Sequence, residues 1–370
     1  MNWSKDLGVL KQLLTYPGNG VFTVQTAKEN KEKLTNALYG KDSDPNEKWS
    51  SGLENLASNK LPVIFGIPSD AGGGIQRGAN WGPLFIRNEL VNDKFYSDKA
   101  KVYDLGDVRV IPHFTSDDIL NELQIKKSRK ALYNDEKVNL PVSPLTIARR
   151  ALEVLYKNFP DQRVLTLGGD HSVSYSAVKE YLLNKKKQGI RTAIIHFDAH
   201  TDLLEDRLGV DLCFGSWAYH ILNDLEKCSD LIQIGIRSSG KDKAFWEEKY
   251  GVQQFWSSEV QELGSEAIIS QITDYLIQED INELYVSFDI DAVDSSYVRA
   301  TGTPEGGGLA PLTCYEILGG LSKAFNITGA DLVEVAPFVN VPCVNSKSSE
   351  PKSTLEVSLD LCRVFIKNLA

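Results

Sequence analysis

Two aspartates and a histidine, residue types that rarely lie in a protein core, stand at the end of one apolar segment. The segment "IIHFDAHTD" (194–202) begins with apolar residues and then carries Asp198, His200 and Asp202 two positions apart. In an extended chain, residues i, i+2 and i+4 point to the same side. These three groups therefore converge if the backbone stays extended beyond the segment, and carboxylates combined with imidazole are ligands for a divalent cation.

Two other segments contribute side chains of the same kinds. "SFDIDAVD" places Asp289 and Asp291 two positions apart, and "LTLGGDHS" places His171 after two glycines that permit close backbone approach. Four aspartates gathered in one pocket would repel one another and would be difficult to desolvate. Two divalent cations would neutralise them. Ligands that are mostly oxygen with some imidazole suit Mn²⁺ better than Zn²⁺, while Ni, Co and Fe remain open.

A pair of divalent cations indicates hydrolytic chemistry. Such a pair activates water near neutral pH and holds the electrophile beside it. Glu334, in "GADLVEVAPFVN", ends another apolar segment, and a carboxylate can meet a planar guanidinium with two parallel hydrogen bonds. A lone aspartate at a strand end is more often a turn former or a helix cap, which is the interpretation of Asp170 and Asp294.

The elements that position these groups recur after residue 60. Apolar, β-branched segments that end in small or polar residues alternate with segments of helical spacing at 143–159, 174–189 and 265–279. This alternation predicts a parallel sheet covered on both faces, with ligands beyond the carboxyl ends of the strands. The predicted strands are 61–70, 163–172, 192–202, 231–239, 283–294 and 330–337.

The polar segments of the chain are expected to lie outside this core. Residues 1–60 predict a helical extension, with helical spacing in "LGVLKQLL" and "NKEKLTNAL" and a loop at 40–52, and residues 114–143 predict a polar surface excursion.

Several motifs together resemble the arginase–agmatinase (ureohydrolase) family. They are "LGGDHS", "HFDAHTD", "SFDIDAVD…ATGTPEGGGL" and "ADLVEVAP", and "GIPSDAGGGIQRGANWGPLFIR" (66–87) matches the early segment of the family. The likeness covers roughly residues 61–365, in the order of the family. It implies an α/β fold with three α/β/α layers and a mostly parallel central sheet, as a single catalytic domain over residues 61–370.

The resemblance also implies a binuclear manganese centre. Asp198 and Asp289 would bridge the metals, Asp202 would pass a proton to the departing nitrogen, and Glu334 would orient the guanidinium. Activated water would attack the guanidinium carbon and release urea and an amine. One metal would be held by His171, Asp198, Asp202 and Asp289, and the other by Asp198, His200, Asp289 and Asp291. The resemblance further implies a homo-oligomer, a trimer or a hexamer.

The sequence departs from the family where the substrate is held. Phe214 stands where members usually carry a histidine, and His220, on the helical segment "GSWAYHIL", is more typical of helix packing. The loop 203–214 differs from that of the arginases. Its acidic residues would suit a cationic substrate tail, whereas Arg207 would meet a carboxylate. Ser238 replaces an aspartate of the arginases, so Arg207, Ser238 and Glu334 are the candidate substrate-binding residues and L-arginine is disfavoured.

Two interpretations other than guanidino hydrolysis stay open. One is a formimidoylglutamase-like hydrolase, whose relatives also lack the histidine replaced here by Phe214. The other is a metal-binding family member that has lost turnover. A metallophosphoesterase is disfavoured, because such sites need more imidazoles and this chain has five histidines with none after His220.

Composition excludes several other classes. The 370 residues are 42% hydrophobic and 24% charged, with a formal net charge of −10, which argues against a nucleic-acid surface. No segment approaches the roughly 20 apolar residues of a membrane span, and the N-terminus lacks the apolar stretch of a signal peptide. The five cysteines include no C-x-x-C pair, so neither a disulfide framework nor a structural zinc is expected. A cytoplasmic protein is predicted.

Overall fold

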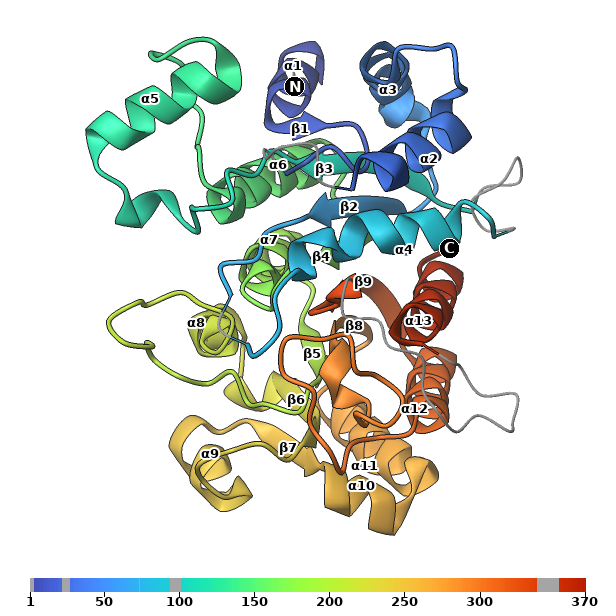
Figure 1. The fold of residues 1–370 in the computed structure, drawn as a ribbon. Helices are drawn as coiled ribbons and strands as arrows, with labels where there is room; N and C mark the ends of the chain where they lie inside the picture. Colours follow the sequence, from blue (N-terminus) through green and yellow to red (C-terminus); the bar gives the residue numbers. More distant parts are fainter. Residues whose placement is uncertain (1–2, 22–26, 73, 94–100, 338–352) are drawn as a thin grey trace.

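The computed structural model describes residues 3–21, 27–72, 74–93, 101–337 and 353–370 (Figure 1). Within these residues one sheet is formed by β1 (Leu14–Thr15), β2 (Val63–Ile67), β3 (Tyr103–Val108), β4 (Val164–Gly168), β5 (Thr192–Phe197), β6 (Leu231–Ile236), β7 (Gln253–Trp256), β8 (Glu283–Asp289) and β9 (Asn326–Val333). The α-helices are α1 (Trp3–Leu13), α2 (Lys28–Tyr39), α3 (Pro45–Glu54), α4 (Gly82–Leu90), α5 (Glu122–Tyr133), α6 (Pro144–Asn158), α7 (Val173–Gln188), α8 (Trp217–Ile221), α9 (Lys243–Tyr250), α10 (Ser257–Leu263), α11 (Ser265–Gln278), α12 (Pro311–Ala324) and α13 (Thr354–Leu369).

The sheet is almost entirely parallel. Its strand order is β1-β3-β2-β4-β9-β8-β5-β6-β7, and only the pair of β1 and β3 is antiparallel. All six predicted apolar segments form strands, namely β2, β4, β5, β6, β8 and β9. Strands β1, β3 and β7 were not predicted. They are short or polar strands toward the edges of the sheet, where the apolar signal of a fully buried strand is absent.

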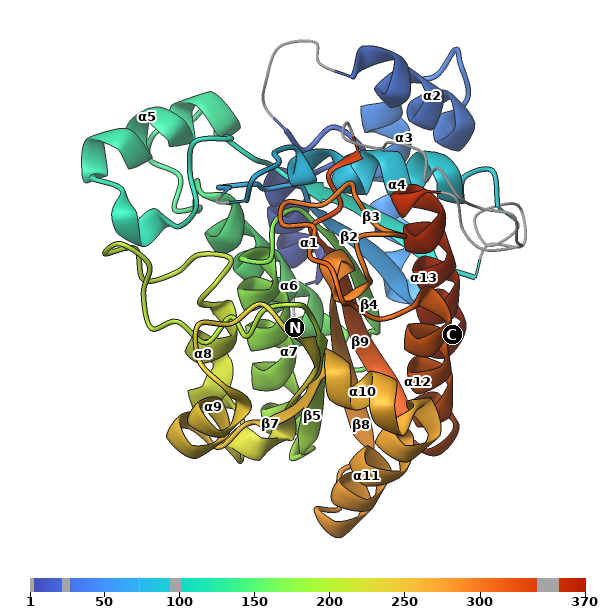
Figure 2. The same cartoon turned by 60° about the horizontal axis from the view of Figure 1, so that its bottom comes forward.

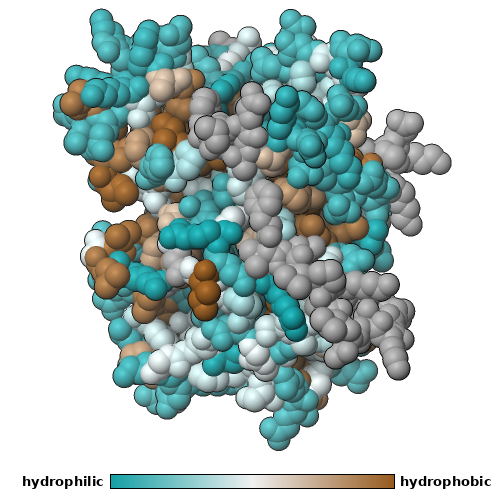
Figure 3. Space-filling model, viewed as in Figure 1, coloured by the Kyte–Doolittle hydropathy of each residue, from teal (hydrophilic) through white to brown (hydrophobic). Residues whose placement is uncertain are grey.

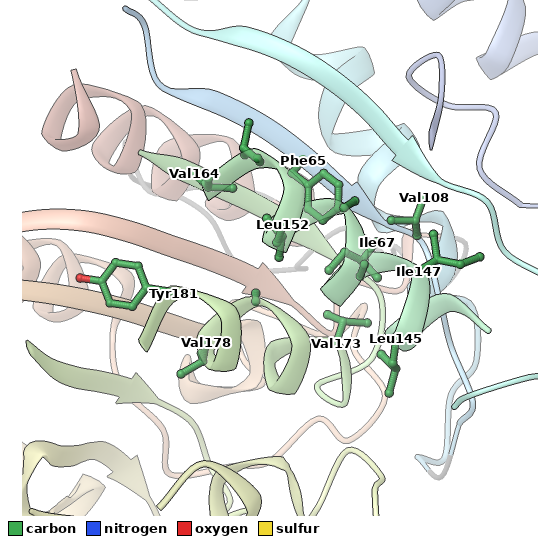
Figure 4. Packing of buried hydrophobic residues seen from close by; sticks show 14 of the residues in the cluster. Phe65, Ile67, Val108, Leu145, Ile147, Leu152, Val164, Val173, Val178 and Tyr181 are labelled. Carbon is green, nitrogen blue, oxygen red and sulfur yellow. The ribbon is translucent and has the colours of Figure 1, made fainter. Parts of the chain in front are cut away.

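Helices cover both faces of the sheet, which confirms the three predicted layers. Figure 2 shows α1, α6 and α7 on one side and α4, α12 and α13 on the other. Each face has its own apolar core. Figure 4 shows part of the first core, which includes Phe65 and Val164 of the sheet, Leu152 of α6 and Val178 of α7. The second core joins α4, α11, α12 and α13 to the opposite face.

The N-terminal segment is helical, as predicted. The loop predicted at 40–52 is wrong from residue 45 onward, where a helix begins. Helix α3 begins at Pro45, and the Asp44 carboxylate caps it by accepting from the backbone N–H of Asn46 at 2.8 Å. An aspartate followed by proline is a helix start signal, which the interpretation as a loop overlooked. Trp49 of α3 is buried and donates its indole N–H to the Leu105 carbonyl of β3 at 3.0 Å. The division into an extension (1–60) and a catalytic domain (61–370) stays a prediction.

The predicted excursion lies at the surface and exposes two apolar side chains, Ile119 and Leu123, among its polar residues. Residues 114–143 carry α5, which starts with a capping box between Asn121 and Gln124. Figure 3 shows a largely hydrophilic face, with apolar side chains gathered at the left edge where α5 and the loop before α8 lie.

Cys213, Cys228, Cys314 and Cys362 are free, and Cys343 lies outside the described residues. Among the described residues, no helix combines the length and apolar character needed to cross a membrane.

Candidate metal centre

Four neighbouring strands end at the same place, which brings the predicted ligands together. In the sheet β4, β9, β8 and β5 lie side by side. His171 follows β4, Glu334 follows β9, and Asp289 is the last residue of β8. Asp198 follows β5, and all four side chains are buried. The prediction that these groups share one edge of the sheet is confirmed.

One set of ligand atoms surrounds the Nδ1 atom of His171. This atom lies 3.1 Å from Asp198 Oδ2, 3.0 Å from Asp202 Oδ2 and 3.2 Å from Asp289 Oδ2. It nevertheless makes no hydrogen bond of acceptable geometry, and one ring nitrogen could not donate to three carboxylates. Adjacent ligands of an octahedral cation with bonds of about 2.1 Å lie about 3.0 Å apart. The spacing therefore fits a cation between these four side chains.

A second set surrounds the Nδ1 atom of His200. This atom lies 3.2 Å from Asp198 Oδ1 and 3.2 Å from Asp291 Oδ2. Asp198 thus faces the two sets with different oxygens, an arrangement in which a carboxylate can bridge two cations. Asp289 is placed in the first set, and its predicted bridging to the second stays a prediction.

Local turns, rather than an extended chain, align these ligands. The chain bends at residues 199–200, where Asp198 Oδ1 accepts from the His200 N–H at 2.7 Å. Asp289 repeats this turn by accepting from the Asp291 N–H at 2.8 Å. The extended backbone that was the condition for this convergence is therefore not met, because each aspartate accepts a hydrogen bond from the residue two positions later and closes a turn. Asp202 has a φ of 51°, in the left-handed region that is strained for residues other than glycine.

The charges of the site are unbalanced when it holds protein groups alone. Burial raises the pKa of Asp289 well above its ordinary value, and the neighbouring charges of Asp291 and Asp198 raise it further. Burial also raises the pKa of Asp198, but the neighbouring imidazoles of His171, His196 and His200 outweigh burial and hold this pKa well below its ordinary value. Divalent cations would remove this repulsion among the carboxylates.

Several supporting groups were not predicted. The His171 Nε2 atom lies 3.1 Å from Ser287 Oγ, and Ser287 donates to Asp331 at 2.9 Å, so His171 carries its hydrogen on Nε2 and leaves Nδ1 free. Trp217 donates its indole N–H to Asp202 Oδ2 at 2.8 Å. Ser287 stands two residues before Asp289, a strand position on the same side that could have signalled it.

His196 was also missed, although it lies in the motif "HFDAHTD". It is fully buried, and its Nε2 atom lies 2.9 Å from Asp198 Oδ2. Distance alone would permit it to be a third imidazole ligand, beside His171, Asp198 and Asp202.

A pocket of about 210 Å³ opens over the ligands. Glu334 lines it and is anchored by accepting from the His171 N–H at 2.9 Å. Burial raises the pKa of Glu334 well above its ordinary value, followed by the charges of Asp289 and Asp170. The other lining residues are His171, His200, Thr201, Asp202, Leu204, Arg207, Phe214, Gly215, Ser238, Ser239, Gly240, Trp246, Asp289 and Thr303.

Both predicted substrate residues from the variable loops reach this pocket. The Arg207 guanidinium lies 4.8 Å above the centre of the Phe214 ring, and Ser238 donates to Glu305 at 2.9 Å. His220 does not line the pocket. Its ring lies edge-on to the Tyr175 ring of α7, with the centroids 6.3 Å apart, which agrees with the interpretation as helix packing.

The aspartates interpreted as turn formers do cap turns. Asp170 accepts from the Ser172 N–H at 3.1 Å, and Asp294 accepts from the Ser296 N–H at 2.8 Å.

Removal of metal by a chelator is expected to lower the melting temperature, because it restores repulsion among the buried carboxylates. Each cation at a free concentration of about 1,000 times its Kd contributes about 4 kcal/mol. Calorimetric melting with and without chelator, with the metal content measured, tests this. Returning Mn²⁺ should restore the melting temperature. An unchanged melting curve after demonstrated metal removal would contradict the expectation.

The chain is similar to proteins of one family over most of its length. A family model described as the arginase family matches residues 61–349. The mitochondrial agmatinase of Gallus gallus is 34% identical over 306 residues, covering 78% of each chain. The mitochondrial guanidino acid hydrolase of Homo sapiens is 30% identical over 74% of this chain and 71% of its own. The solved structure of formimidoylglutamase from Bacillus subtilis has a TM-score of 0.64 at 22% identity, covering 84% of this chain and 87% of that chain, which shows the shared fold.

Proposed function

This chain belongs to the arginase family and is a metal-dependent ureohydrolase, and on that premise we propose that it cleaves a carbon–nitrogen bond of a small guanidino compound to release urea. The observation that carries this proposal is the presence of two ligand sets that share Asp198, beside the carboxylate of Glu334 in one pocket. We propose Mn²⁺ as the cation in both sets, since oxygen ligands predominate.

The ligands of the two cations are assigned from the two sets. When bound, the two cations supply a nucleophile from water near neutral pH. His171, Asp198, Asp202 and Asp289 would hold one of them, and His200, Asp198 and Asp291 the other.

Two carboxylates act on the substrate itself. Glu334 would accept hydrogen bonds from the guanidinium and aim its carbon at the cation sites. Asp202 would carry a proton to the departing nitrogen, because its carboxylate lines the pocket beside Glu334 and is held there by the indole N–H of Trp217.

The outer half of the pocket favours a substrate whose tail is a carboxylate. Among the residues that line the pocket, Arg207 is the only lysine or arginine, and the acidic lining residues all lie at the metal end. Glu205, on the same loop, is paired with Lys249 at 3.0 Å and therefore does not offer a free site to a cationic tail. The Phe214 ring supports the guanidinium of Arg207 from one side, which orders it for a carboxylate. Ser238 is proposed as a further polar contact at the rim.

The test compares three substrates with four-carbon tails that end in an anionic, a cationic or an uncharged group. They are 4-guanidinobutyrate, agmatine and n-butylguanidine, each assayed for urea with the Mn²⁺-loaded protein. We expect kcat/KM to be highest for the acid. Arg207→Gln should lower kcat/KM for the acid by about 10- to 100-fold, the effect of about 1.5–3 kcal/mol for a hydrogen bond to a charged group, and should change that of n-butylguanidine little. Arg150→Gln, on exposed α6 surface, is the control.

Each other outcome identifies a different function. Highest activity with agmatine, retained in Arg207→Gln, would contradict the proposed carboxylate tail. Formamide produced from formimidoylglutamate, with no urea from any guanidino compound, would instead support the formimidoyl hydrolase. Two bound metals per chain with no product would indicate a member without turnover. A homo-oligomer, trimer or hexamer, is proposed and is tested by light scattering.

A further inference from the structure

A row of buried polar side chains crosses three strands and ends at the metal centre. His196 of β5 lies directly opposite Gln233 of β6, and Gln233 lies opposite Gln254 of β7. Trp256 follows two residues after Gln254, on the same side of β7. His196, Gln233 and Gln254 are all buried, so each polar atom in the row needs a partner.

Hydrogen bonds connect the row from end to end. The Trp256 indole N–H donates to Gln254 Oε1 at 2.9 Å, and Gln254 Nε2 donates to Gln233 Oε1 at 2.8 Å. Gln233 Nε2 lies 2.9 Å from His196 Nδ1, and His196 Nε2 lies 2.9 Å from Asp198 Oδ2.

The direction of these hydrogen bonds is determined at both ends. An indole nitrogen can only donate, so Gln254 must turn its oxygen toward Trp256 and its nitrogen toward Gln233. Gln233 Nε2 also donates to the Thr201 carbonyl at 2.6 Å, and a carbonyl can only accept. Gln233 therefore presents N–H to His196, and the Nδ1 atom of His196 must be the acceptor.

We propose that Trp256, Gln254 and Gln233 hold His196 as the tautomer that carries its hydrogen on Nε2, so that His196 positions Asp198 by hydrogen bonding and is not a ligand of either cation. As a ligand through Nε2, His196 would need its hydrogen on Nδ1. That hydrogen would point at the N–H of Gln233, two donors 2.9 Å apart with no acceptor between them.

The consequence for Asp198 is that both of its oxygens are held. Oδ1 accepts from the His200 N–H at 2.7 Å, and Oδ2 accepts from His196 at 2.9 Å. Each oxygen keeps a second lone pair, which faces His171 on one side and His200 on the other. The carboxylate therefore cannot rotate away from its position between the two ligand sets. This part of the inference rests on the proposed pair of cations.

The tautomer is tested first in the metal-free protein, where the result does not depend on the proposed function. Two-bond ¹H–¹⁵N correlation spectra of protein labelled at histidine report which ring nitrogen carries hydrogen, and the spectrum of His196→Gln assigns the His196 signals. We expect an unprotonated Nδ1 and a protonated Nε2 at residue 196. A ring with hydrogen on Nδ1, alone or on both nitrogens, would overturn the proposal.

Paired substitutions of His196 then separate positioning from ligation. His196→Gln retains an N–H near the position of Nε2, whereas His196→Leu has none. We expect His196→Gln to bind two Mn²⁺ per chain with nearly the wild-type Kd, and His196→Leu to bind them 10- to 100-fold more weakly, the usual effect of losing a partner of a ligand. Loss of one cation from both variants would identify His196 as a ligand and refute the proposal.

Gln233→Met tests the row itself. It removes the donor to His196 with little change in volume. The control is Gln253→Met, at the residue before Gln254 in β7, where the side chain donates to the Ser229 carbonyl at 2.8 Å and is not part of the row. We expect about tenfold weaker Mn²⁺ binding in Gln233→Met only, with loss of the single His196 tautomer. Equal effects in both variants would refute a specific role for the row. Wild-type protein that binds fewer than two cations would contradict the proposed metal centre, while the spectrum of His196 would still decide the tautomer.

Discussion

Asp198→Ala is expected to lose both cations and to lower the rate of urea release by at least about a thousand-fold. Asp198 is the one described ligand that faces both sets, with Oδ2 3.1 Å from His171 Nδ1 and Oδ1 3.2 Å from His200 Nδ1. Its removal deprives each cation of a ligand. The loss of several kcal/mol of charge stabilisation corresponds to about three orders of magnitude in rate. Elemental analysis together with a urea assay measures both effects.

Two further variants separate ligand loss from general damage. Asp291→Ala touches the second set only, and should keep one cation per chain. Asp230→Ala removes an equally buried carboxylate, one that binds Arg191 at the opposite edge of the sheet, and should lower stability but keep both cations. Full metal content in purified Asp198→Ala would show that the ligand assignment is wrong. Asp289→Ala is likewise expected to lose metal and activity.

Arg87→Ala is expected to lower the free energy of unfolding by about 3–5 kcal/mol, the largest effect of a substitution on stability that we predict. Arg87 of α4 is fully buried, and its guanidinium meets Asp104 at 2.8 Å and Asp107 at 2.5 Å. Asp107 also accepts from the Gly18 N–H at 2.8 Å, so this cluster ties the N-terminal segment to the sheet. Removal of the cation leaves two carboxylates in the interior without their counter-charge. Urea denaturation measures the change.

The control for Arg87 is an arginine of the same chemistry in water. Arg150 pairs with Glu153 at 2.6 Å, but the two side chains are 44% and 47% exposed. Arg150→Ala should therefore change the free energy of unfolding by less than about 1 kcal/mol. Equal losses in the two variants would mean that burial of the Arg87 cluster contributes nothing to stability.

The metal centre and the parallel sheet could be predicted from the sequence alone. The spacing of Asp198, His200 and Asp202, repeated in part by Asp289 and Asp291, by itself indicated a metal centre. Six apolar segments that end in polar residues indicated a parallel sheet. In such a sheet all the carboxyl ends lie at one edge, so residues that follow neighbouring strands lie close together. The placement of Glu334 followed from the same rule.

Contacts between distant residues decided the rest. Convergence of the spaced side chains required an extended chain after Asp198. Instead, Asp198 and Asp289 each accept a hydrogen bond from the backbone N–H two residues later, which forms a turn. Such local side-chain hydrogen bonds compete with the extended backbone, and residue spacing does not reveal them. His196 and Gln233 are 37 positions apart, and only strand order and register place them in one row. The loop before α8 placed Arg207 and Phe214 in the outer pocket, and the start of α8 placed Trp217 against Asp202. Residue types and local periodicity thus determined what could bind and where strands form. Which groups hold those ligands in place depended on cross-strand register and loop packing, because these arise only when the whole chain has folded.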